Sequence, residues 1–159
     1  MATGAKPPTL VVLQLTGDYA YPEYDITPLA LACRYLGQDL MNPPSVEGWH
    51  TGKEWIDTGN LVERINFAAD RVGEPVKPGI RRITDALRAQ GRLSPEALVD
   101  RCVELVGPFA VKEGTYASLV GFVEQARVPA FDGTDDAADE HRVVQLLQLI
   151  VSTREYQMA

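Results

Sequence analysis

The run LGQDLMNPPSVEGWHTGKEWIDTGNLVER, residues 36–64, interrupts an otherwise regular pattern of amphipathic helices. It contains both tryptophans of the chain, one of its two histidines, a Pro-Pro pair and four glycines. Helical spacing of apolar residues precedes and follows this run, but it is lost inside the run. We therefore expect a long ordered loop here, on which the flanking helices are organised, and it is the first place to look for function.

The composition describes one soluble globular domain. The chain has 159 residues, of which 45% are hydrophobic and 23% are charged, and both fractions are ordinary for such domains. The net charge is −7 and the sequence pI is about 4.8. A surplus of acids argues against nucleic acid and against an anionic membrane surface as partners, because both require a surplus of Lys and Arg. We predict neither partner.

Cysteine usage and apolar runs give no sign of secretion or of membrane insertion. Cys33 and Cys102 each lie among apolar residues at helical spacing, so we predict two buried thiols. No apolar run reaches the roughly 18 residues that a membrane span needs. The short apolar run at residues 9–15 has no clear cleavage site after it, so no signal peptide is predicted and the cytoplasm is the default location.

Before the loop, the sequence predicts a flexible or irregular segment over residues 1–15, then a single helical domain over residues 16–159. Thr27 and Pro28 are a cap-then-proline start for a helix. The apolar residues that follow, spaced by three and four, form one stripe: Leu29, Cys33, Leu36 and Leu40. Pro43 should end this helix, because proline has no amide to donate and disfavours the α conformation before it.

After the loop, proline and glycine punctuate a series of further helices. We predict helices from about 57–60 to Gly73, over 78–90, from Ser94 to about 106, over 113–126, and from about 136 to the C-terminal region. The acids Asp135, Asp136, Asp139 and Glu140 are expected to be a solvated helix start, favoured by the helix dipole. The apolar run at residues 9–15 could be a buried strand or a short helix, and helix is favoured because no second strand is present to pair with it. The fold class is therefore all-α, an irregular bundle of about six short helices with one long ordered loop rich in Trp, Gly and Pro.

The preferred interpretation of the loop is structural. Trp49 and Trp55 can anchor an irregular segment by burying their rings while each indole N–H finds an acceptor. Gly48, Gly52 and Gly59 would supply backbone angles that other residues adopt only at a cost, and Pro43 and Pro44 would stiffen the start of the loop. Under this interpretation the domain is a non-catalytic structural or protein-binding module, and whether it is also part of an enzyme stays open.

The alternative interpretation is a ligand-binding or hydrolytic cleft. Aromatic rings beside carboxylates are typical of sites for glycans and small molecules. The residues that would form such a cleft are Glu47, Trp49, His50, Glu54, Trp55 and Asp57. No catalytic residue can be named, because the loop has no nucleophile motif and no phosphate-binding glycine pattern. We predict no metal and no cofactor, since the loop has one histidine and His141 lies on a distant helix.

The same loop resembles a bacterial family known as domain of unknown function 1800. Its members carry a pattern of the type G-Q-x-L-x-x-P-P-x-V-x-G-W-x-x-G-x-x-W-I. In this chain the pattern falls on Gly37, Gln38, Leu40, Pro43, Pro44, Val46, Gly48, Trp49, Gly52, Trp55 and Ile56. The closing VVQLLQLIVSTREYQ is similar to the family's L-L-x-S-P-E-F-Q ending, with Thr153-Arg154 in place of Ser-Pro and Tyr156 in place of Phe.

The resemblance covers the chain from about Leu15 to the C-terminus, and it carries implications for partners rather than for chemistry. Members of the family are longer, so this chain resembles their C-terminal portion. The family has no established activity. The implied partners are the N-terminal part of the same protein or the product of a neighbouring gene, with self-association expected if an apolar surface is left bare.

Overall fold

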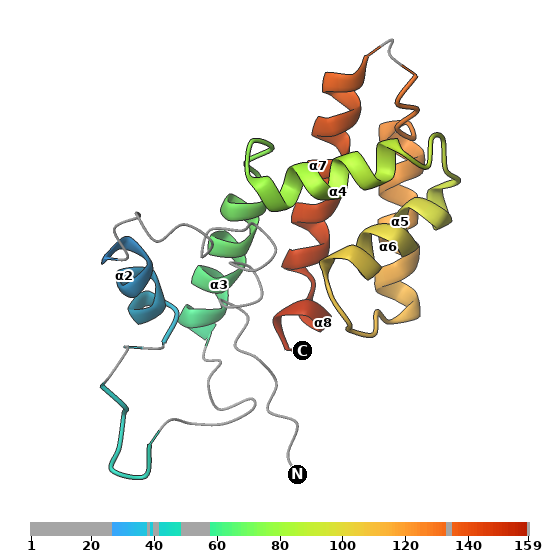
Figure 1. The fold of residues 1–159 in the computed structure, drawn as a ribbon. Helices are drawn as coiled ribbons and strands as arrows, with labels where there is room; N and C mark the ends of the chain where they lie inside the picture. Colours follow the sequence, from blue (N-terminus) through green and yellow to red (C-terminus); the bar gives the residue numbers. More distant parts are fainter. Residues whose placement is uncertain (1–26, 38, 40–41, 49–57, 133–134, 159) are drawn as a thin grey trace.

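The computed structural model describes residues 27–37, 39, 42–48, 58–132 and 135–158. Within these ranges the chain forms seven α-helices and no β-strand (Figure 1), so the predicted all-α class is confirmed. The helices are α2 (Thr27–Tyr35), α3 (Thr58–Val72), α4 (Pro78–Arg88), α5 (Pro95–Val106), α6 (Glu113–Ala126), α7 (Asp136–Ser152) and α8 (Arg154–Gln157). None of the described helices has the length and apolarity that crossing a bilayer would need.

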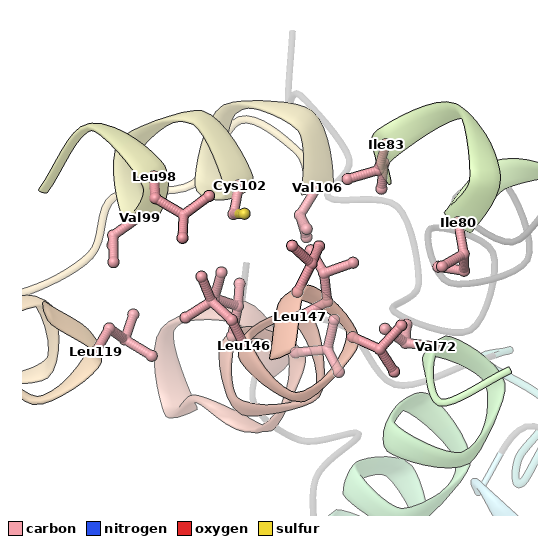
Figure 2. Packing of buried hydrophobic residues seen from close by; sticks show 14 of the residues in the cluster. Val72, Ile80, Ile83, Leu98, Val99, Cys102, Val106, Leu119, Leu146 and Leu147 are labelled. Carbon is pink, nitrogen blue, oxygen red and sulfur yellow. The ribbon is translucent and has the colours of Figure 1, made fainter. Parts of the chain in front are cut away.

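Helix α7 lies at the centre of the bundle and packs against α3, α4, α5, α6 and α8. Its buried apolar residues point to several sides: Val143, Val144, Leu146, Leu147, Ile150 and Val151. Figure 2 shows the neighbours that enclose Leu146 and Leu147, namely Leu98, Val99, Cys102 and Val106 of α5, Leu119 of α6, Ile80 and Ile83 of α4, and Val72 of α3. A helix that is apolar on several faces must be surrounded by others, as α7 is.

Local sequence chemistry sets the helix ends after the loop. Ser94 Oγ accepts a hydrogen bond from the Ala97 amide at 3.2 Å, and Pro95 is the first helical residue of α5. Gly91 ends the turn after α4 with a φ of +69°, a conformation that favours glycine. Helix α6 spans the predicted residues, and α4 ends two residues earlier than predicted.

The first described helix is shorter than the sequence pattern predicts. Its apolar stripe and Pro43 suggest a helix that continues towards Asn42, but α2 ends at Tyr35. The Gly37 amide donates to the Arg34 carbonyl at 3.1 Å, and Gly37 has a φ of +84°. A left-handed glycine is a common helix stop, and here it acts before the proline does.

Three further details differ from the sequence prediction. The apolar spacing from Leu61 to Val72 predicts that Val62 faces the core, but Val62 is exposed and Arg64 is buried. The one-turn helix α8 was not predicted, although Thr153 Oγ1 accepts from the Tyr156 amide at 3.2 Å and so caps it. Asp139 is buried rather than solvated.

The predicted N-terminal segment 1–15 and most of the predicted loop, residues 49–57, lie outside the described residues.

The central position of α7 gives a direct stability prediction. Leu147 is fully buried and Leu149, on the same helix, is 40% exposed. Leu147→Ala should lower the free energy of unfolding by about 3 kcal/mol, because it removes buried surface and leaves a cavity. Leu149→Ala is the matched control and should cost less than about 1 kcal/mol. Denaturant unfolding of the two variants measures the difference, and equal losses would contradict the central placement of α7.

Candidate functional site

The predicted ligand residues lie in two groups with respect to the described structure. Glu47 is described and is exposed in a tight turn, in which the Gly48 amide donates to the Ser45 carbonyl at 3.0 Å. The Glu47 amide also lies 3.3 Å from Ser45 Oγ, which accepts its hydrogen bond. The other predicted ligand residues lie outside the described ranges: Trp49, His50, Glu54, Trp55 and Asp57. The proposed cleft therefore stays a prediction.

The predicted structural motif is described at four of its positions. Pro43 and Pro44 are exposed, and Gly48 has a φ of +99°, which explains a glycine at the end of the turn. Gln38 and Gly52 lie outside the described ranges. Gly37, which follows α2, lies close to the Asn60 side chain of α3. A Cβ atom added at Gly37 would lie 2.5 Å from Asn60 Nδ2. Gly37 is thus required both by its backbone angle and by the close approach of Asn60.

A second cluster of charged residues surrounds the start of α7. Asp139 is buried, and its Oδ2 accepts hydrogen bonds from the Ala130 and Phe131 amides, both at 2.8 Å. Its Oδ1 accepts from the Arg142 guanidinium. A carboxylate that accepts hydrogen bonds from two backbone amides and from an arginine has its oxygens occupied by structural contacts. Asp139 therefore holds the segment before α7 against the helix.

Arg88 of α4 completes this cluster from the other side. Its guanidinium donates to Glu140 and to Asp85, and Asp136 lies 3.8 Å away. The same group lies over the Phe131 ring, 5.4 Å from its centroid. The hydrogen bond that Arg88 donates to Glu140 is the main cause that raises the pKa of Arg88 above its ordinary value. These contacts connect α4 to α7, so the cluster is explained by the fold alone.

An open cavity of about 280 Å³ lies beside Asp139. It is lined by Arg127, Ala130, Asp132, Asp135, Asp139 and Arg142. Its most buried charged groups, Asp139 and Arg142, are already paired with each other. Among the residues that the structure describes, no three His, Cys, Asp or Glu side chains are grouped so that they could hold a metal ion. The cavity thus has charged walls but no reactive group.

The two cysteines lie in different environments and form no disulfide with each other. Cys102 is buried in the core, as predicted, and burial raises the pKa of its thiol to about 12. Cys33 of α2 is only half-buried, and burial is the main cause that raises its pKa. Both thiols are therefore protonated at neutral pH, and a protonated thiol is a poor nucleophile.

The most unusual polar group in the described chain is Arg64, which the sequence analysis missed. Arg64 is 4% exposed, and its Nε and one terminal nitrogen have no hydrogen-bond partner. Burial lowers the pKa of this guanidinium below its ordinary value. The signal that could have found it is its spacing, because Arg64, Ala68 and Val72 recur every four residues on one face of α3.

Comparison with known proteins identifies the family. A family model described as "Protein of unknown function (DUF1800)" matches residues 2–158. The chain belongs to the DUF1800 family. No curated protein matches this chain, and no solved structure matches it. The match begins at residue 2, so it extends further towards the N-terminus than the resemblance inferred from the motif.

The DUF1800 description names no activity, so function has to be argued from the residues of this chain. In this DUF1800 protein an apolar core surrounds α7, and the charges of Arg88, Asp139, Glu140 and Arg142 at the start of α7 are paired. Arg64 lies on α3, and the family signature belongs to the sequence between α2 and α3. That part is where a functional surface is expected.

Gly37 provides the sharpest test of the motif. Gly37→Ala should lower the free energy of unfolding by about 2 kcal/mol, because alanine is strained at a positive φ and its Cβ would press on Asn60. Gly114→Ala is the control, since a Cβ there meets nothing within 4 Å. The control should change stability by less than about 0.5 kcal/mol. Thermal or denaturant unfolding measures both, and an unaffected Gly37→Ala variant would refute this role of Gly37.

Proposed function

We propose that this DUF1800 chain is a non-catalytic helical module that binds another protein through the surface of α2 and the adjoining part of α3. The supporting observation is the position of the exposed large apolar side chains. Most of those in the described chain lie before α4: Leu31, Tyr35, Val46, Val62 and Val76. Among the described residues later in the chain, Leu149 and Met158 are the exposed large apolar ones. Two of the five before α4, Leu31 and Tyr35, lie together on α2, and exposed apolar groups on one helix are typical of interaction surfaces.

Helix α2 is the element best suited to such contact. It packs on α3, on the side away from α7 (Figure 1). Leu31 is 50% exposed and Tyr35 is 68% exposed. They are four residues apart and therefore share one face of the helix. Aromatic residues beside an aliphatic one are common in the centres of protein interfaces.

The chemistry of the described residues favours binding over catalysis. The buried carboxylate of Asp139 is used by backbone amides, and the thiol of Cys102 has a pKa of about 12. Neither group is available as a nucleophile or as a general base. A binding partner is expected to cover the α2 face, and a second copy of this chain takes that place when no other partner is present.

This proposal predicts reversible self-association that depends on α2. Sedimentation equilibrium should show a dimer, and its dissociation constant should rise at least roughly tenfold in Leu31→Ser and in Tyr35→Ser, because each change removes apolar area from the contact. A tenfold change in the dissociation constant corresponds to about 1.4 kcal/mol of binding free energy. Leu149→Ser, on the exposed side of α7, is the matched control and should leave the dimer intact. A chain that stays monomeric at high concentration, or a dimer that Leu149→Ser weakens equally, would contradict the proposal.

A ligand-binding or hydrolytic cleft at residues 47–57 is the second candidate function. The observation that favours it is the exposure of Glu47 at the tight turn, which leaves its carboxylate free to meet a ligand. The proposed ligands are glycans or small molecules, held by Trp49, His50, Glu54, Trp55 and Asp57 together with Glu47.

The position of the tryptophans makes this second candidate easy to test. Trp49 and Trp55 are the only two in the chain, so tryptophan fluorescence reports on this segment alone. A binding oligosaccharide should shift or quench the emission in a saturable manner, and Glu47→Gln should weaken that response. Asp70→Asn, at an exposed acid on α3, serves as the control. Emission that no oligosaccharide changes would remove glycan binding from consideration.

A further inference from the structure

The cavity of about 280 Å³ lies where three parts of the chain meet: the end of α6, the segment 128–132 and the start of α7. Five of its six lining residues are charged, and they carry both signs: Arg127, Asp132, Asp135, Asp139 and Arg142, with Ala130 as the sixth. Pockets for drug-sized ligands measure roughly 300–1,000 Å³, so this cavity has room for a smaller molecule. Its charged lining indicates that such a molecule is itself charged.

The wall of this cavity is fixed by contacts within the fold. Asp139 Oδ2 accepts hydrogen bonds from the Ala130 and Phe131 amides, both at 2.8 Å. The Arg88 guanidinium of α4 lies over the Phe131 ring, 5.4 Å from its centroid. Contacts with α7 and with α4 thus hold the segment 128–132 in place. A wall that is already ordered lowers the entropic cost of binding a ligand.

The cavity has basic groups that the fold does not use. Arg127 follows α6 directly with a φ of +67°, at a position where glycine is common. It is exposed, and within the described chain its guanidinium forms no ion pair. Arg142 donates one N–H to Asp139, and its remaining N–H groups have no acceptor among the described residues. Arginine N–H groups that stay available in a cavity are good donors for a carboxylate.

The cavity also has a carboxylate that α7 leaves available. Asp135 directly precedes α7, where the side chain of an aspartate usually caps the first amides of the helix. Asp135 is exposed, and among the described contacts its side chain forms no such cap. Because Asp139 and Arg142 neutralise each other, the charges that remain in the cavity are Arg127 and two aspartates. The cavity therefore offers both a cation and an anion to a ligand.

We propose that this cavity binds a free α-amino acid, whose carboxylate accepts hydrogen bonds from Arg127 and whose ammonium group donates to Asp135. The planar fork of an arginine matches the two oxygens of a carboxylate, and an ammonium group has three N–H donors. A ligand with only negative charge would be repelled by the aspartates, and one with only positive charge by the arginines. A zwitterion pairs with both signs. The site lies at α6 and α7, so it does not depend on the α2 surface.

Isothermal titration calorimetry of the wild-type protein with the standard L-amino acids tests the proposal. At least one of them should bind in a saturable manner. Its amide lacks the carboxylate charge and its N-acetyl derivative lacks the ammonium charge, so each should bind at least roughly tenfold more weakly. If no standard amino acid binds, or if either derivative binds as tightly as the free amino acid, the proposal is overturned.

Two substitutions at exposed positions assign the contacts. Arg127→Gln should reduce the affinity for the free amino acid at least roughly tenfold, to that of its amide, because the carboxylate loses its partner. Asp135→Asn keeps a residue type that favours the start of a helix, and it should reduce the affinity to that of the N-acetyl derivative. Arg92→Gln and Asp70→Asn are the matched controls, because both residues are exposed and lie outside the cavity, and they should keep full affinity. Full affinity in Arg127→Gln or in Asp135→Asn would overturn the proposal.

Discussion

The burial of α7 is the constraint on which the rest of the structure depends. From Val143 to Val151 this helix carries apolar residues on several faces, and it is enclosed by α3, α4, α5, α6 and α8. Each neighbouring helix then needs only one apolar face. Two polar contacts fix the position of α7 along its axis: Gln148 donates to the Ala69 carbonyl, and Asp139 receives the Ala130 and Phe131 amides. Both contacts use backbone groups, so they hold the helix in one register.

Sequence reasoning succeeded where the determining chemistry is local. Ser94 followed by Pro95 specifies a helix start through a side-chain cap and a residue without an amide, and the structure has both. The last helix has apolar residues over a wide arc from Val143 to Val151, which predicts its burial, and α7 is buried. Sequence reasoning failed where a distant residue decides the outcome. Gly37 ends α2 early and fits closely against Asn60, which is more than 20 residues away in sequence.

Two buried charges show the same limit. Arg64 and Val62 are two positions apart on α3, and the apolar pattern alone favoured the valine for the interior. Helix α3 packs against α7 and α8 with the face that carries Arg64, so Arg64 is buried and Val62 is exposed. The sequence around Asp139 is compatible with a solvated helix start, and only the folded segment at Ala130 and Phe131 reveals its role. Of the predicted ligand residues, Glu47 alone lies among the described residues, and the cleft stays a prediction.

The molecule thus has two ends with different properties. At one end α4–α7 enclose an apolar core, and paired charges lie at the start of α7. At the other end lie α2 with its exposed Leu31 and Tyr35, and Arg64, which lacks a counter-charge among the described residues. Stability is concentrated at the first end, and the exposed apolar groups proposed to contact another protein lie at the second. This division is the reason to look for protein binding at α2 and α3.

Residue-resolved amide hydrogen exchange tests this division most directly. Exchange reports the free energy of the opening that exposes each amide, and centrally packed helices open only when the whole protein unfolds. Amides of α7 between Val143 and Val151 should exchange with the free energy of global unfolding, and those of α2 near Leu31 should exchange much faster. If α7 opens well below the free energy of global unfolding, or if α2 is protected as strongly as α7, then α7 is not the centre of this fold.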